Sequence, residues 1–130
     1  MGLFDFFGKK TETTTNDQKQ IPWIRLTHKE QLEEIEAISK TIPVAIFKHS
    51  TSCGISRMVL RNFENDFDID AAQLKLYYLD LLAFRDVSNE VGYKFQVIHQ
   101  SPQLLVIKNG ITVYHASHHN IHAGDLERYL

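Results

Sequence analysis

A strand–helix–strand pattern in the middle of the chain constrains its fold more than any other feature. Pro43 opens an apolar run at residues 44–47 that does not alternate with polar residues, as in a central strand covered on both faces. After Cys53 the apolar residues recur at helical spacing, which predicts a helix over residues 54–66: Ile55, Met58, Val59, Phe63 and Phe67. Residues 74–79 form the next apolar run, so the two strands should be parallel with a right-handed crossover.

The segment before this unit adds a strand and a helix. Residues 21–26 read as a short first strand. Thr27 and Glu30 have the spacing of a capping box, which predicts a helix start with Thr27 as its N-cap. The helix that follows would place three apolar residues on one face: Leu32, Ile35 and Ile38.

The C-terminal part reads as a helix, a hairpin and a last helix. Residues 84–91 predict a short helix stopped by Gly92. Strands at 103–107 and 111–115 flank Asn109-Gly110, a strong hairpin turn. The last helix should hold Leu126, Tyr129 and Leu130. The order βαβαβα followed by ββα predicts an α/β fold: a mixed central sheet with a C-terminal antiparallel hairpin and helices on both faces.

Length and composition describe a single ordinary domain. The 130 residues are 43% hydrophobic and carry a formal net charge of −2, which excludes the basic field of a nucleic-acid binder. No apolar run reaches the roughly 20 residues that span a bilayer, so no stable membrane association is expected. Residues 1–20 hold a Phe-rich stretch and a Thr-rich linker and are predicted to be a flexible leader to a domain at residues 21–130.

Cys53 is the single cysteine of the chain and the candidate catalytic residue. A lone cysteine excludes an internal disulfide framework and fits a reducing, cytoplasmic compartment. The sequence Thr51-Ser52-Cys53-Gly54-Ile55-Ser56 places the thiol between the central strand and the helix start. Unpaired backbone N–H groups and the helix dipole stabilise a thiolate there.

Several neighbours of Cys53 could support its thiolate. Lys48, His49 and Arg57 are close in sequence and would add positive potential. Ser56 lies one turn into the helix and could donate a hydrogen bond to the sulfur. It also stands where a dithiol motif has its second cysteine, so this chain can attack a disulfide but cannot resolve the product internally. A buried structural cysteine is the alternative interpretation.

The arrangement resembles the thioredoxin fold. The matching parts are residues 44–47, the segment Cys53-Gly54-Ile55-Ser56, and Pro102 before a strand that ends in Lys108-Asn109-Gly110. Proteins of this fold carry a cis-proline ahead of that strand, facing the active sulfur. Cis bonds are essentially a proline phenomenon, and the resemblance therefore implies that Pro102 is cis.

Residues 22 to 130 also resemble the YtxJ family of monothiol bacilliredoxins, through Phe47-Lys48-His49-Ser50-Thr51-Ser52-Cys53-Gly54-Ile55-Ser56 and Tyr114-His115-Ala116-Ser117-His118. The family motif is Thr-Cys-Pro-Ile-Ser. Here Ser52 intervenes before the cysteine and Gly54 replaces the proline, while Ile55 and Ser56 are kept.

This resemblance implies a reaction and its partners. The thiolate of Cys53, supported by Gly54, Ile55 and Ser56, would remove bacillithiol or a similar low-molecular-weight thiol from modified client proteins. The implied substrate-binding residues are Thr51, Ser52, Ser101 and Pro102. The small thiol serves as a co-substrate, and no organic cofactor or metal is needed.

Three other interpretations remain open. Cys-Gly-Ile-Ser is similar to the Cys-Gly-Phe-Ser motif of monothiol glutaredoxins, which carry an iron–sulfur cluster with glutathione, although the glutathione clamp after the hairpin is missing here. A thioredoxin-fold adaptor or stress protein without turnover is the second. The third is metal binding, since spacings of three and four place some of a group of histidines on one helical face: His115, His118, His119 and His122.

Overall fold

The computed structural model describes residues 20–130, and the predicted leader falls almost wholly outside this range. Along the described chain the element order is the predicted one, with 3₁₀ helices at the end. The strands are β1 (Trp23–Arg25), β2 (Val44–His49), β3 (Lys75–Asp80), β4 (Gln103–Lys108) and β5 (Ile111–Ser117). The helices are α2 (Gln31–Ile38), α3 (Gly54–Asp66), α4 (Arg85–Phe95), η1 (His118–Asn120) and η2 (Ala123–Tyr129).

The described strands form one mixed sheet in the order β1-β3-β2-β4-β5. β1, β3 and β2 are parallel, while β4 is antiparallel to β2 and to β5. β2 lies at the centre and all its residues are buried, as its unbroken apolar run predicted. The parallel pairing across the α3 crossover and the antiparallel terminal hairpin are both confirmed.

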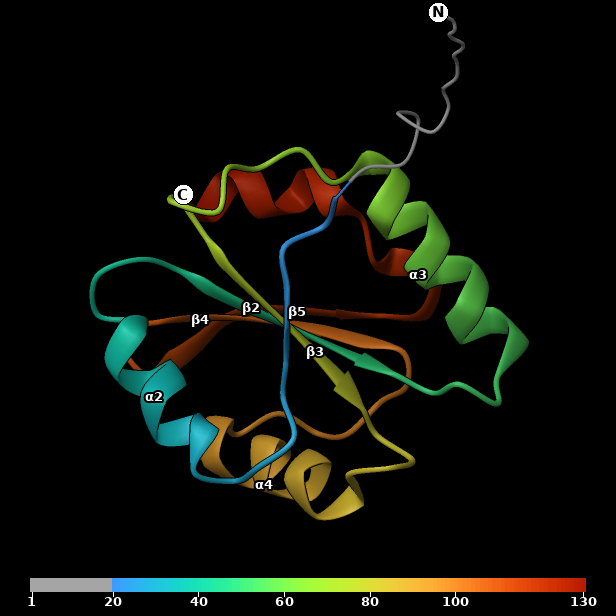
Figure 1. Ribbon diagram of the computed structural model, residues 1–130, viewed down its shortest axis with the longest axis horizontal. Coiled ribbons are helices and arrows are strands. Elements are labelled where there is room, and N and C mark those ends of the chain that lie inside the picture. Colours follow the sequence, from blue (N-terminus) through green and yellow to red (C-terminus); the bar gives the residue numbers. More distant parts are fainter. Residues whose placement is uncertain (1–19) are drawn as a thin grey trace, which may run out of the picture.

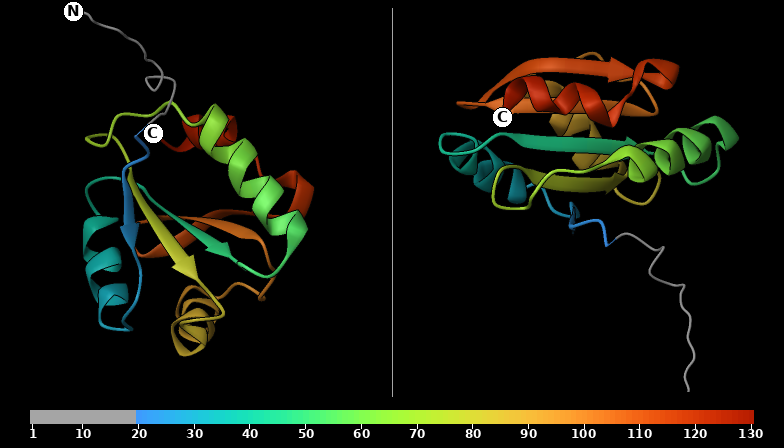
Figure 2. Two further views of the ribbon diagram at one scale, coloured as in Figure 1. Left: turned by 45° about the vertical axis from the view of Figure 1, so that its right-hand side comes forward. Right: turned by 90° about the horizontal axis from the view of Figure 1, so that it is seen from above.

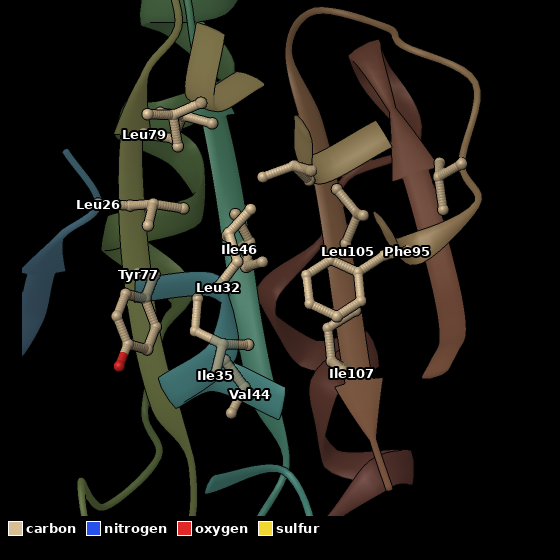
Figure 3. Close-up of a cluster of buried hydrophobic side chains, with 13 residues drawn as sticks. Leu26, Leu32, Ile35, Val44, Ile46, Tyr77, Leu79, Phe95, Leu105 and Ile107 are labelled. Atoms are coloured by element: carbon tan, nitrogen blue, oxygen red, sulfur yellow. The ribbon is translucent and has the colours of Figure 1, made fainter. Parts of the chain in front are cut away.

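Helices cover both faces of the sheet (Figure 1). α2 and α4 lie on one side, and α3 lies with the C-terminal 3₁₀ helices on the other; Figure 2 shows the same layers from two further directions. Alternate residues of β2 enter two hydrophobic cores. Val44 and Ile46 pack on the α2 and α4 side, shown in Figure 3, whereas Ala45 and Phe47 pack on the α3 side.

The predicted start of the first helix is wrong. α2 begins at Gln31 and its N-cap is Glu30, without a side-chain cap. Instead of capping, Thr27 belongs to the preceding loop, where Gln31 Oε1 accepts hydrogen bonds from the backbone N–H groups of Thr27 and His28 at 2.7 and 2.9 Å. The side-chain amide of Gln31, the first residue of the helix, thus accepts the hydrogen bonds that these loop N–H groups need. Leu32 and Ile35 are buried as predicted.

The predicted end of the third helix is also wrong, because α4 runs through Gly92 to Phe95. Gly92 permits a close approach: a Cβ there would lie 3.0 Å from the carbonyl oxygen of Val97. The left-handed residue that ends the helix is Gln96 (φ 58°). The last predicted helix forms as the 3₁₀ helix η2, in which Leu126 is buried, while Leu130 follows it and is exposed.

The hairpin turn is confirmed. Asn109 and Gly110 both have positive φ angles, 54° and 78°, as a two-residue type I′ turn requires. The turn is tied to the body of the domain, since the Gly110 N–H donates to Ser39 Oγ at 2.8 Å and the Asn109 N–H to the Ser39 carbonyl. These bonds fix the far end of β4, and β4 in turn carries Pro102 at its start.

Candidate active site

Cys53 is the N-cap residue of α3, in an extended conformation. Its side chain is partly exposed, unlike that of a structural cysteine inside a core. The first hydrogen bond of the helix runs from the Arg57 N–H to the Cys53 carbonyl at 3.1 Å. The N–H groups of Gly54, Ile55 and Ser56 precede that bond and therefore have no acceptor within the helix. The sulfur thus sits at the positive end of the helix dipole.

Ser56 is fully buried and its hydroxyl joins three segments of the site. The Ser50 N–H donates to Ser56 Oγ at 3.0 Å, and His49 Nδ1 lies 2.8 Å from the same oxygen. The carbonyl of Ser50 in turn accepts from the Cys53 N–H at 3.2 Å. The sequence-based prediction that Ser56 donates to the Cys53 sulfur is not supported, because the hydroxyl's hydrogen bonds within residues 20–130 are those to Ser50 and His49.

His49 is a site residue whose role the sequence pattern did not show. Burial lowers the pKa of His49 below its ordinary value of 6.5, opposed by the Asp80 charge and assisted by that of Arg57, so the imidazole is neutral at pH 7. In the tautomer with its proton on Nε2, it accepts the Ser56 proton at Nδ1. The hydroxyl then has no proton left to donate to Cys53.

The loop before Cys53 carries Thr51 and Ser52, the two hydroxyl residues predicted to bind substrate, and contacts with Arg57 and Ser50 hold it in place. The Arg57 guanidinium donates to the Thr51 carbonyl at 3.1 Å, which places its charge across the first turn of α3. Ser52 Oγ lies 3.4 Å from Ser50 Oγ. Thr51 and Ser52 are both exposed, so their side chains are accessible to a client protein.

Pro102 lies at the same edge of the sheet as Cys53. The Ser101–Pro102 peptide bond is cis, as the resemblance implied. Gln103, the next residue, pairs with Lys48 at the end of β2. The Gln103 amide also holds the preceding segment, because it donates to the Ile98 carbonyl at 3.0 Å and accepts from the Gln100 N–H at 3.3 Å.

Lys48 does not join the Cys53 loop. Its side chain is fully buried, and it alternates with His49 on β2, so it points to the face covered by α2 and α4. Burial lowers the pKa of Lys48 to about 8. Of the three basic residues near Cys53 in sequence, Arg57 is therefore the one that brings a charged group beside the Cys53 loop in the described structure.

The C-terminal histidines are spread over different elements. His115 lies on β5, His118 and His119 on η1, and His122 precedes η2, so the common helical face predicted for some of them does not form. Within residues 20–130, no group of three or more His, Cys, Asp or Glu side chains is arranged to hold a metal ion. The same residues contain no helix long and apolar enough to cross a membrane.

The fold and the site together define a thioredoxin-fold protein with a thiol redox role. A partly exposed cysteine at the start of α3 and a cis-proline at the start of β4 share one edge of the sheet. The chain belongs to the family described as monothiol bacilliredoxin BrxC, whose model matches residues 24–126. The single cysteine fits that monothiol description.

Solved structures support the same fold. One, described provisionally as an oxidoreductase with a thioredoxin fold, is 28% identical with a TM-score of 0.70, over 83% of this chain and 93% of that one. Thioredoxin from Malassezia sympodialis is 20% identical with a TM-score of 0.62, over 85% and 92%. Fasciola hepatica thioredoxin is 18% identical with a TM-score of 0.58, over 80% and 92%. The two thioredoxins show the fold alone.

Proposed function

We propose that this protein removes bacillithiol, or a similar low-molecular-weight thiol, from mixed disulfides on client proteins. The observation that carries the proposal is the position of the chain's single cysteine, which caps α3 and is partly exposed. Membership of the monothiol bacilliredoxin family supports this choice of substrate. The serine at position 56 supports a reaction with a single protein sulfur.

The reaction consists of two thiol–disulfide exchanges. In the first, the Cys53 thiolate attacks the sulfur of the small thiol in the mixed disulfide. The bond between client and small thiol breaks, the client leaves as a thiolate that takes a proton from water, and Cys53 keeps the small thiol as a new disulfide. In the second, a free thiol, as its thiolate, attacks that small-thiol sulfur, forms a disulfide with it and releases the Cys53 thiolate.

The surrounding residues would support each exchange in a different way. The unpaired N–H groups of Gly54 and Ile55 stabilise the thiolate before attack and when it leaves again. Thr51 and Ser52 offer exposed polar groups beside the sulfur. On the other side, the backbone of Ser101 and Pro102 would align the incoming disulfide. Ser56 keeps the loop in place through Ser50 and His49.

The test is intact-mass spectrometry of the purified protein after incubation with a bacillithiol-modified client. We expect one bacillithiol adduct per chain, mapped to Cys53, and a matching amount of reduced client. Cys53→Ser should form no adduct and release no bacillithiol, whereas Ser117→Ala, a change of a hydroxyl residue on β5, should behave as wild type. Release of bacillithiol by the Cys53→Ser variant would refute the mechanism.

A further inference from the structure

Ser56 is the third residue of α3, and Cys53 is the N-cap of the same helix. Side chains at these two positions lie close together, as in a capping box. A serine hydroxyl there can donate to the sulfur, and a hydrogen bond to the charged form stabilises a thiolate. The direction of the Ser56 hydroxyl proton therefore bears on the reactivity of Cys53.

Two partners determine that direction. The Ser50 N–H can only donate, so Ser56 Oγ accepts from it at 3.0 Å and keeps its own proton for another group. Ser56 is fully buried, and buried polar groups are normally hydrogen-bonded. Within residues 20–130, the acceptor for the hydroxyl proton is His49 Nδ1, at 2.8 Å. Nδ1 accepts only when it has no proton, so the neutral imidazole carries its proton on Nε2.

The surroundings of His49 leave this bond in place. His49 is buried, and the Tyr78 ring lies beside it with the two ring centroids 5.8 Å apart. The charges that act on the imidazole belong to the end of β3 and to α3: Asp80, Arg57 and Glu64. In the described part of the chain none of these groups hydrogen-bonds to Nδ1, whose partner is Ser56. Nothing in residues 20–130 therefore competes with Ser56 for this nitrogen.

The oxygen of Ser56 is held at a fixed place in the Cys53 loop. The Ser50 carbonyl accepts from the Cys53 N–H at 3.2 Å, while the Ser50 N–H donates to Ser56 Oγ. These two bonds fix the oxygen relative to the cysteine backbone, so the main freedom left to the hydroxyl is rotation about its Cβ–Oγ bond. That rotation decides whether the proton points to His49 or to the sulfur.

We propose that His49 is a positioning residue: it binds the Ser56 proton and thereby withholds it from the sulfur of Cys53. The thiolate then relies on the N–H groups of the first turn and receives no hydrogen bond from the serine. A hydrogen bond that stabilises a thiolate also weakens it as a nucleophile, so this arrangement favours the attack of Cys53 on the mixed disulfide. The inference rests on the proposed function and concerns the control of its nucleophile.

The direction of the proton is tested by NMR of the full wild-type chain with nitrogen-15-labelled histidine at pH 7. We expect the His49 ring to show an unprotonated Nδ1 and a protonated Nε2. His49→Asn identifies the two signals because they are missing from its spectrum. A protonated Nδ1 at this pH would overturn the inference, whatever the variants below do.

The effect on Cys53 is tested by alkylation with iodoacetamide, measured as the rate constant on the high-pH plateau where every thiol is ionised. His49→Phe removes the acceptor but keeps an aromatic ring, so the hydroxyl can turn to the sulfur. We expect the plateau rate to fall about threefold, for a thiolate stabilised about tenfold. His49→Asn retains an acceptor close to the place of Nδ1 and should keep the wild-type rate. The control His122→Phe, which changes an exposed histidine, should also keep it.

A double-mutant cycle separates this role from a structural one. Ser56→Ala should change the plateau rate of the wild type by less than about twofold, because the proton does not reach the sulfur there. In the His49→Phe background the same change should restore the rate. Equal effects of Ser56→Ala in the two backgrounds, or an unchanged rate in His49→Phe, would overturn the inference. Iodoacetamide takes the place of the mixed disulfide, so these results do not depend on whether the protein transfers bacillithiol, and failure of the proposed function is recognised separately.

Discussion

Replacing Lys48 with methionine should stabilise the free protein at pH 7. The buried lysine has a pKa of about 8 in the folded protein, against an ordinary value of 10.5. Each pH unit between two such values corresponds to about 1.4 kcal/mol, so keeping the ammonium charged in the fold costs about 3 kcal/mol. Methionine has a similar unbranched shape and no charge, and a gain of about 2–3 kcal/mol in the free energy of unfolding is expected.

The pH dependence of this effect has a definite sign. Between pH 8 and 10.5 the unfolded chain holds the Lys48 proton and the folded chain does not, so the wild-type stability rises with pH. Lys48→Met lacks this contribution. The advantage of the variant should therefore be full below pH 8 and shrink by about 1.4 kcal/mol per unit above it. Burial raises the pKa of Tyr77 and Tyr78, and a comparison kept below pH 9.5 avoids their titration.

Urea unfolding of both proteins at pH 7, 8 and 9, followed by tryptophan fluorescence, measures this difference. The same buffer ions should be used at each pH, because an anion that binds the folded protein would change its stability. Lys40→Met serves as the matched control and should change stability by less than about 0.5 kcal/mol at each pH. A Lys48→Met protein that is less stable than wild type at pH 7, or whose advantage does not depend on pH, would refute the reasoning.

Three further outcomes are expected. Ser56→Ala leaves the buried Ser50 N–H and His49 Nδ1 without their partner, and urea unfolding should show a loss of about 2–4 kcal/mol in the free energy of unfolding. The control Ser52→Ala should lose less than about 0.5 kcal/mol. Equal small losses in the two variants would contradict the hydrogen-bond network around Ser56. Ser56→Cys should form an internal disulfide with Cys53 under mild oxidation, seen as the loss of both free thiols, and a fully reduced variant would show that position 56 is out of reach. Anaerobic reconstitution with iron, sulfide and glutathione should leave the protein colourless, and a stable cluster spectrum would favour the glutaredoxin-like alternative.

Most of the fold could be predicted because hydrophobic period and turn chemistry act locally. The buried run of β2, the period of α3 and the turn at Asn109-Gly110 each needed a few adjacent residues. The errors came from competition between local signals. Gln31 offered its side chain to the donors of the loop before α2, which displaced the capping role predicted for Thr27. Gly92, predicted to stop the helix, instead lies inside a longer helix, where it lets the Val97 carbonyl approach the helix backbone closely.

The site was only partly predictable for a different reason. Position relative to a helix start can be read from sequence, and Cys53 is the N-cap as expected. The hydrogen-bond partner of a hydroxyl cannot be read from sequence, because the orientation of the Ser56 side chain depends on packing. Its oxygen faces His49, which lies seven residues earlier on another element. Hydrophobic patterning also gave no sign that a lysine inside the central strand would be fully enclosed.

Alternation along β2 separates the two polar residues at its end. His49 points to the α3 side, where it binds the serine that replaces a resolving cysteine, and Lys48 points to the α4 side, where the described chain offers its ammonium no acceptor. Successive strand residues face opposite sides of a sheet, so the end of β2 organises the Cys53 loop with one side chain and encloses an ammonium on the other side. Exchanging the two residues would place a charge next to Ser56 and an imidazole beneath α4. The hydrogen bond between His49 and Ser56 should then be lost, although the composition of the strand is unchanged.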